Sequence, residues 1–232
     1  MASDGKSLGR TISRPAALSL GVAVGVVLIL VARWLMLGGG SPSITALVAA
    51  GAKVDELVLD GEWWRLASAG LLHASATHLI VNALLLGFAL VAWLRLGRAR
   101  HDEGIGRAAA ALAMTILTSF IGFGVSTLAR SGASAGASAA AHGMLAAVVV
   151  SVWIRRADLP PSLARVGPMA VTAAFIAVLL ASSAAQGVDH AAHLGGVAAG
   201  VALTPLAESR ARPGLIGLAA ALAVTSLIAA FT

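Results

Sequence analysis

The stretch GASAGASAAAHGMLAAVVVSVWI, residues 132–154, begins with the repeat GASAGASA and continues as an apolar run. We expect a helix from Ser138 onward, short and dominated by alanine, glycine and valine. Small side chains let helix backbones approach closely, so such a helix suits a buried position better than contact with lipid. Residues 138–154 are therefore predicted to be a central helix of a bundle.

The remainder of the chain predicts an all-α polytopic membrane protein. Of its 232 residues, 59% are hydrophobic and 11% are charged, and the apolar residues come in long runs that are typical of membrane-spanning helices. The expected spans are residues 16–37, 76–95, 107–128, 138–154, 168–186, 189–206 and 213–231. The first is long enough to cross a bilayer of about 30 Å, and we interpret it as a retained helix and not a signal peptide.

The basic residues predict the orientation. They lie in short clusters between the apolar runs, and twelve of the 16 Lys and Arg residues fall on one side if the N-terminus is cytoplasmic. The four on the outer side are Arg33, Lys53, Arg65 and Arg130. This positive-inside bias predicts an integral protein in contact with the lipid bilayer, with its N-terminus in the cytoplasm, and the membrane that we expect is a bacterial inner membrane. The net charge of +6 does not indicate nucleic-acid binding.

We expect one transmembrane domain, residues 16–232, preceded by a short basic cytoplasmic tail at residues 1–15. An amphipathic outer loop would occupy residues 38–75, and residues 213–231 would form an additional C-terminal helix. Without cysteine, the chain has no disulfide or thiolate nucleophile. No internal repeat is visible, which disfavours a transporter with repeat symmetry.

The outer loop carries the motif GEWWRL at residues 61–66. Its two tryptophans suit a segment lying among lipid headgroups. Glu62 and Arg65 predict an exposed ion pair, which contributes little to stability.

Polar side chains inside spans are costly, so each one needs a structural or functional reason. The segment LLHASATHLIVN, residues 71–82, contains His73, His78 and Asn82. His78 and Asn82 are four residues apart and would share one helix face. Hydrogen bonds between helices are one explanation, and a functional site is the other.

Two further segments carry polar residues near the expected outer side. Ser134, Ser138 and His142 are spaced by four and would share a face if all were helical. Serines in membrane helices often serve only packing or local hydrogen bonds. In VDHAAHLGGVAAG, residues 188–200, His193 precedes a small-residue face that favours close helix packing.

The predicted topology brings three of these residues to a similar depth. The second, fourth and sixth spans all start at the outer side, so His78, Ser138 and His193 would lie close to one plane. A serine, a histidine base and additional hydrogen-bond donors are the groups that acyl transfer requires.

Four motifs in this order resemble the rhomboid family of intramembrane serine proteases. The resemblance runs from about residue 45 to 206, and the seventh span fits members that carry an extra C-terminal helix. The motifs are GEWWRL at 61–66, HASATHLIVN at 73–82, GASAAAHG at 136–143 and AHLGGVAAG at 192–200. The third motif is degenerate, because the family has glycine where Ala139 stands.

The resemblance implies a role for each matching residue. Ser138 would be the nucleophile and His193 its general base, with His78, Asn82 and the Ser138 backbone N–H as the oxyanion hole. The motif residues with structural roles would be Glu62, Trp64, Arg65, Gly136, Gly143, Gly196 and Gly200. No cofactor and no metal are implied. A metalloenzyme built on the histidines is disfavoured, because the sequence has no H-E-x-x-H motif.

The family pattern favours Ser138 over Ser134, because Ser138 has a glycine two residues before it and another five residues after it. His142 stands where most members have an apolar residue, and the His-Gly pair is similar to that of rhombosortases. His142 is also a competing base, although a histidine on the same helix is poorly aimed at Ser138. Asp189 could assist His193, but a helix N-cap is favoured.

The resemblance also implies the substrate class. Transmembrane segments of other membrane proteins would enter sideways between the second and fifth spans and be cleaved near the outer leaflet. The alternative is a catalytically inactive rhomboid-like protein that binds membrane helices, for which Ala139 and His142 are the relevant departures.

Overall fold

The computed structural model describes residues 14–97, 104–184 and 187–231. Residues 1–13 of the expected basic tail lie outside this range. The described chain is helical, and its one element of β-type pairing is an isolated bridge between Lys53 and Ser134.

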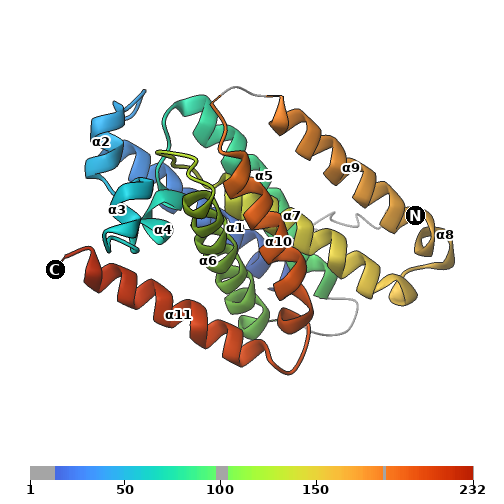
Figure 1. Cartoon of the computed structure of the whole chain (residues 1–232). Helices are drawn as coiled ribbons and strands as arrows, with labels where there is room; N and C mark the ends of the chain where they lie inside the picture. Colours follow the sequence, from blue (N-terminus) through green and yellow to red (C-terminus); the bar gives the residue numbers. More distant parts are fainter. Residues whose placement is uncertain (1–13, 98–103, 185–186, 232) are drawn as a thin grey trace, which may run out of the picture.

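Seven long helices follow the predicted spans to within a few residues at each end (Figure 1). They are α1 (Arg14–Met36), α5 (Ala76–Leu96), α6 (Ile105–Leu128), α7 (Ser138–Ile154), α9 (Val166–Ser183), α10 (His190–Ala207) and α11 (Arg212–Ala229). Short helices α2 (Ile44–Ala49), α3 (Asp55–Leu59) and α4 (Arg65–Ser68) occupy the first loop, and α8 (Pro161–Ala164) precedes α9.

Local sequence signals explain several helix starts. The Ser75 side chain accepts a hydrogen bond from the His78 N–H and so caps α5, and Asp189 caps α10 in the same way through the Ala192 N–H. Pro213 occupies the first turn of α11, where its missing N–H costs nothing.

Five of the described helices are long and apolar enough to cross a membrane, namely α1, α5, α6, α9 and α11. The remaining two long helices, α7 and α10, are the small-residue segments that the sequence places inside the bundle. Residues 139–148 of α7 are all buried. The protein is therefore an integral membrane protein in which α7 is a buried central helix and α10 packs one face against it.

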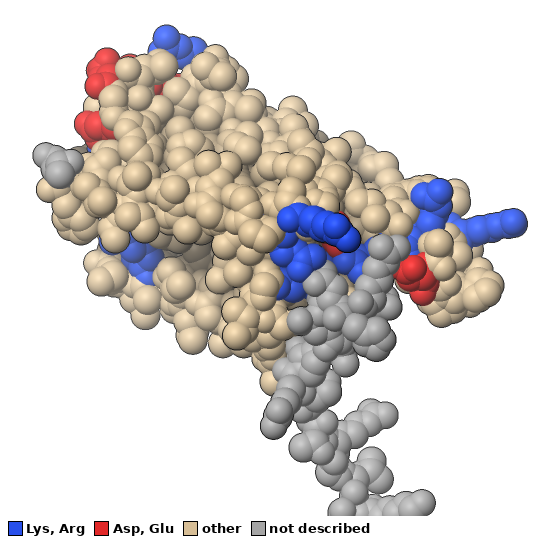
Figure 2. Space-filling view, turned by 90° about the horizontal axis from the view of Figure 1, so that it is seen from below, with Lys and Arg blue, Asp and Glu red and all other residues tan. Residues whose placement is uncertain are grey.

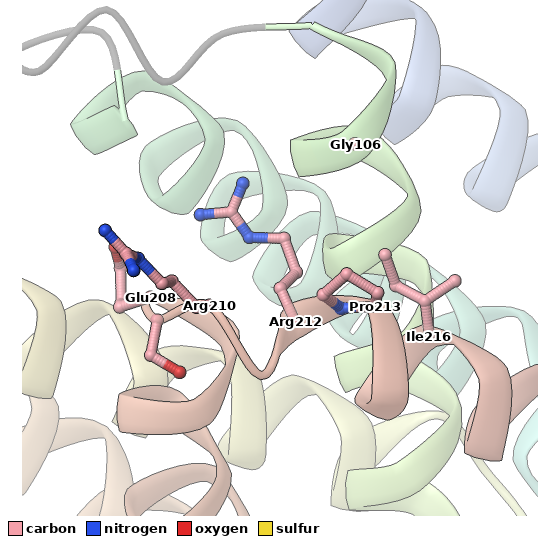
Figure 3. Close-up of a pocket in the computed structure, with 7 residues that line it drawn as sticks. Gly106, Glu208, Arg210, Arg212, Pro213 and Ile216 are labelled. Carbon is pink, nitrogen blue, oxygen red and sulfur yellow. The ribbon is translucent and has the colours of Figure 1, made fainter.

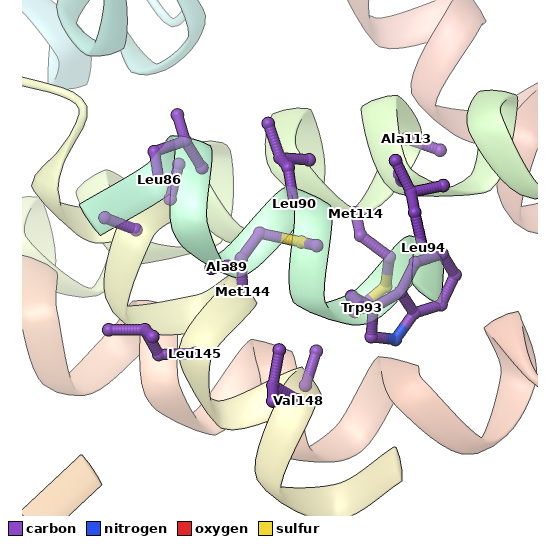
Figure 4. Close-up of a cluster of buried hydrophobic side chains, with 14 of the residues drawn as sticks. Leu86, Ala89, Leu90, Trp93, Leu94, Ala113, Met114, Met144, Leu145 and Val148 are labelled. Atoms are coloured by element: carbon purple, nitrogen blue, oxygen red, sulfur yellow. The ribbon is translucent and has the colours of Figure 1, made fainter. Parts of the chain in front are cut away.

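Glycine makes the contact between α7 and α10 unusually close. A Cβ atom added at Gly196 would overlap the backbone of Ala139, and one added at Gly200 would overlap the backbone of Gly143. Larger side chains at these positions would force the helices apart. Beside this contact, the apolar core is filled by Leu86, Leu90, Trp93 and Met144 among others (Figure 4).

The two ends of the bundle carry the charge. Figure 2 shows the charged side chains gathered in separate groups, at the left, near the middle and at the right of this face, with uncharged surface between the groups. Helices α2, α3 and α4 lie together at one end (Figure 1), which we call the first-loop end. Glu208, which follows α10, lies at the opposite end, which we call the Glu208 end.

Candidate active site

The segment before α7 is a loop, and the two copies of the GASA repeat have different structures. Ser134 lies in the loop, where its backbone N–H and C=O pair with those of Lys53 at 2.9 and 3.0 Å. Ser138 is the first residue of α7 and is half-buried. The helix starts at Ser138, as the sequence predicts, so Ser134 lies in the loop and does not share a helix face with Ser138 and His142.

Gly136 brings the loop against α5. Its φ of 135° is a conformation that favours glycine, and an added Cβ would lie 2.6 Å from His78 Cε1 and 3.3 Å from Asn82 Nδ2. The His78 ring and the Asn82 amide thus lie against the chain two residues before Ser138. Asn82 Nδ2 is buried and has no hydrogen-bond partner among the described residues, which leaves an amide donor available at this place.

His193 lies in the first turn of α10 and stacks on His142. The ring centroids are 4.1 Å apart and the ring planes are inclined by 21°. The Nδ1 atom of His193 is buried and has no hydrogen-bond partner in the described part of the chain. No hydrogen bond joins the Ser138 hydroxyl to His193 among the described residues; such bonds are often long before substrate binds.

The His142 ring is already engaged by other groups. Its Nδ1 lies 2.8 Å from the Ser138 carbonyl oxygen, which can only accept, so Nδ1 carries the proton. Its Nε2 faces the Ser182 hydroxyl at 3.2 Å, near the end of α9. His142 therefore contacts the backbone of Ser138 and not its hydroxyl, which supports the lower rank given to it as a base.

Ala139 is fully buried and fills a helix-packing space. Its methyl group packs in a cluster with Leu66, Phe123 and Ala192. A Cβ added at Gly122 on α6 would lie 2.8 Å from the Ala139 Cβ. The extra methyl that distinguishes this motif is thus accommodated by a glycine on the neighbouring helix.

The first loop is organised around Arg65, which is only 7% exposed. Its Nη1 donates to the carbonyl oxygens of Val48 at 2.7 Å and Ala52 at 3.0 Å, and its Nε pairs with Glu62 at 2.7 Å. The Trp64 ring lies 4.7 Å from the guanidinium. The expectation of an exposed ion pair is wrong for Arg65, because this side chain reaches inward to satisfy backbone carbonyls.

His73 is a site residue to which the sequence reasoning gave no role. It is fully buried, and its Nε2 accepts a hydrogen bond from the Ala137 N–H at 3.4 Å, directly before Ser138. Burial, with a smaller contribution from His78, lowers the pKa of His73 to about 4. The sequence shows His73 as a polar residue shortly before α5. Nothing near it in the sequence indicates that its partner, Ala137, lies 64 residues away.

Asp189 acts as the N-cap that the sequence favoured. Its Oδ1 accepts from the Ala192 N–H at 2.9 Å, and its Oδ2 accepts from the hydroxyl of Ser126.

A separate cavity of about 750 Å³ lies between Gly106, Glu208, Arg212 and Ile216 at the Glu208 end (Figure 3). That cavity is remote from His193, because the length of α10 separates them.

The chain is similar to known proteins over most of its length. Residues 60–210 match the model of the Rhomboid domain. The chain is 30% identical over 168 residues to RHOMBOID-like protein 4 of Arabidopsis thaliana, covering 71% of this chain and 39% of that protein. It is also 30% identical over 166 residues to Rhomboid protease GluP of Bacillus subtilis (strain 168), covering 72% of this chain and 30% of that protein. The chain thus spans well under half the length of either relative, and the matched region contains the whole candidate site. The chain belongs to the rhomboid family.

Proposed function

We propose that the chain is an intramembrane serine endopeptidase that cleaves transmembrane segments, with Ser138 as nucleophile and His193 as general base. One observation carries the proposal: three helix starts converge on the loop that leads to Ser138. His78 and Asn82 on α5 lie against Gly136, and the backbone of Ala139 on α7 touches α10 one turn beyond His193.

In the proposed reaction, His193 removes the proton of the Ser138 hydroxyl as the oxygen attacks the scissile carbonyl. The amine leaves with that proton, and water then hydrolyses the acyl-enzyme. The unpartnered Asn82 amide, with His78 and the Ser138 N–H, would stabilise the oxyanion. Each such donor contributes about 3 kcal/mol in comparable sites.

The loose packing of α9 supports sideways access for the substrate. Only 6% of its span is buried, compared with 56% for α6, and Figure 1 shows α9 lying apart from α1 and α6. We propose that a substrate helix enters between α5 and α9. The N-terminus would be cytoplasmic, which places the site toward the outer leaflet of the inner membrane.

The other candidate is a rhomboid-like protein that binds membrane helices without cleaving them. The observation in its favour is that the Ser138 hydroxyl makes no hydrogen bond to His193 in the described structure. This candidate predicts substrate binding with no turnover in any variant.

The test uses the purified full chain in detergent with a labelled model substrate that has one transmembrane helix. Ser138→Ala and His193→Ala should each abolish cleavage. Ser134→Ala should retain it, because that hydroxyl has no hydrogen-bond partner in the described structure. His142→Ala should slow cleavage without abolishing it, since it removes only the ring that stacks on His193. Loss in Ser134→Ala alone would overturn the assignment, and an inactive wild type that still binds the substrate would establish the second candidate.

A further inference from the structure

A buried ammonium group lies between the two segments that carry the proposed catalytic pair. We infer that Lys53 is a positioning residue, which aligns the loop before Ser138 with the helix that carries His193. The inference rests on the proposed function and adds to it a residue that lies outside the motifs that mark the family in this chain.

Lys53 is fully buried, although it carries a charge. Its ammonium pairs with the Asp55 carboxylate and donates hydrogen bonds to the Ser126 hydroxyl at 2.7 Å and the Gly132 carbonyl oxygen at 2.8 Å, so three acceptors surround it. These acceptors come from the first loop, from the last turn of α6 and from the loop before α7. One side chain thus joins three segments that are far apart in the sequence.

The first connection holds the loop that precedes the nucleophile. Besides the contact of Lys53 with the Gly132 carbonyl, the Gly132 N–H donates to the Asp55 carboxylate at 2.5 Å. The Lys53 backbone pairs with Ser134, and the Gly136 N–H donates to the Ala69 carbonyl at 2.9 Å. Every second residue from 132 to 136 is therefore fixed to the first loop.

The second connection reaches the helix that carries the base. The hydroxyl of Ser126 accepts from Lys53 and donates to Asp189. Asp189 caps α10 through the Ala192 N–H, and its carbonyl accepts from the His193 N–H at 3.2 Å. The series of contacts from Lys53 through Ser126 thus ends at Asp189, one helical turn before His193.

The cost of burying charge argues for a positioning role. Replacing a buried ion pair with apolar residues of similar size is often neutral or stabilising, so stability alone gives little reason to place Lys53 here. A buried ammonium that bonds the Ser126 hydroxyl and the Gly132 carbonyl and pairs with the Asp55 carboxylate instead holds these three acceptors close to one another. A nucleophile and base held by two separate segments need such a fixed distance, because a misplacement of about 1 Å can lower the rate about 100-fold.

The test breaks the connection at Ser126 without removing any charge. Ser126→Ala removes the hydroxyl between Lys53 and Asp189, whereas Ser119→Ala makes the same change on the same helix at a buried hydroxyl that has no partner among the described residues. We expect Ser126→Ala to lower kcat about 10- to 100-fold with KM within about twofold of wild type. Ser119→Ala should leave both parameters within about twofold.

Amide hydrogen exchange followed by mass spectrometry reads the same connection without turnover. Ser126→Ala should speed exchange in residues 131–137 and 190–194, and Ser119→Ala should not. If the two variants have equal kcat, equal KM and equal exchange, the inference about Lys53 is overturned. The proposed function still stands in that case, provided that the wild type cleaves the substrate. An inactive wild type would remove the proposed function, and with it a catalytic purpose for Lys53, even if exchange showed the two segments to be joined.

Discussion

Two buried charge clusters hold the two ends of α10, and they are built in opposite ways. At the first-loop end, one cation serves two carboxylates, since Lys53 pairs with Asp55 and reaches Asp189 through Ser126. At the Glu208 end, one carboxylate serves two cations, since Glu208 pairs with both Arg107 and Arg155. We call these the first-loop cluster and the Glu208 cluster.

The Glu208 cluster ties four helices together directly. Arg107 at the start of α6 donates to both carboxylate oxygens of Glu208 and to the Trp93 carbonyl of α5 at 2.6 Å. Arg155 and the Ser151 hydroxyl bring α7 to the same carboxylate. The residues of the Glu208 cluster lie on the long helices or directly after them. In the first-loop cluster, Lys53 and Gly132 lie in loops and Asp55 is the first residue of the short helix α3.

This difference indicates that the Glu208 cluster stabilises the helix bundle, whereas the first-loop cluster aligns the residues of the site. Bonds between helices that already pack together mainly add stability at the Glu208 end. Bonds from a buried cation to loops, which have little packing of their own, fix the positions of the residues that those loops carry. We therefore expect damage at the Glu208 end to lower stability and damage at the first-loop end to lower the catalytic rate.

The largest expected effect comes from Glu208→Gln. It leaves two buried guanidinium groups without their carboxylate, which costs about 3–5 kcal/mol in comparable buried pairs. The rate per folded molecule should stay within about threefold of wild type, because α10 remains capped at its other end. Thermal unfolding in detergent, with activity corrected for the folded fraction, measures both quantities.

The matched control is Glu56→Gln, which makes the same change at an exposed carboxylate in the first loop. It should alter stability by no more than about 0.5 kcal/mol. A rate loss in folded Glu208→Gln as large as in Ser126→Ala would contradict the division of roles between the two clusters.

Acid should affect the two ends in different pH windows. The pKa of His73 is lowered from 6.5 to about 4 in the folded protein, so between these values the unfolded chain takes up a proton that the folded chain does not. Stability therefore falls as the pH falls through this window, by at most about 3 kcal/mol. Below about pH 4 the folded His73 takes up the proton as well, and its Nε2 can then no longer accept from the Ala137 N–H.

Glu208 responds in a lower window. Burial alone would raise the pKa of Glu208, but the charges and hydrogen bonds of Arg107 and Arg155 lower it below its ordinary value. Its contribution is present above the pKa of the unfolded carboxyl and is lost as the pH falls through the folded value. Melting temperatures against pH for wild type, His73→Gln and Glu208→Gln measure this; equal slopes between pH 6.5 and 4 in wild type and His73→Gln would refute the role of His73.

The sequence predicted the elements that depend on local pattern. Apolar runs located the seven long helices. The small side chains of residues 138–154 correctly marked α7 as buried, whereas α10 buries only one face and leaves Leu194 and Val201 exposed. Asp189 was recognised as a cap because capping is a relation between residues three apart. The assignment of catalytic roles to Ser138 and His193 remains a prediction.

Contacts across long sequence separations escaped prediction for a physical reason. Lys53 was placed only as a basic residue of the outer side, since nothing in its neighbourhood shows that its partner Ser126 lies 73 residues away. Arg65 was expected in an exposed pair, because the loop carbonyls that it binds become neighbours only after α2 folds back. Polar groups that are satisfied by distant backbone atoms leave no periodic signal in the sequence.

The smallest expected effect is that of Ala139→Gly, which restores the residue usual in the family. The Ala139 methyl is buried in the space that Gly122 leaves on α6, so its removal should lower stability by about 1 kcal/mol. Because the methyl fills helix packing on the α6 side, kcat should stay within about threefold of wild type. The matched control is Ala141→Gly, the same change at another fully buried position of α7. A rate increase above about tenfold in Ala139→Gly alone would show that the methyl restricts the site, and would move the cause of any weak activity from the packing of α7 to the nucleophile motif itself.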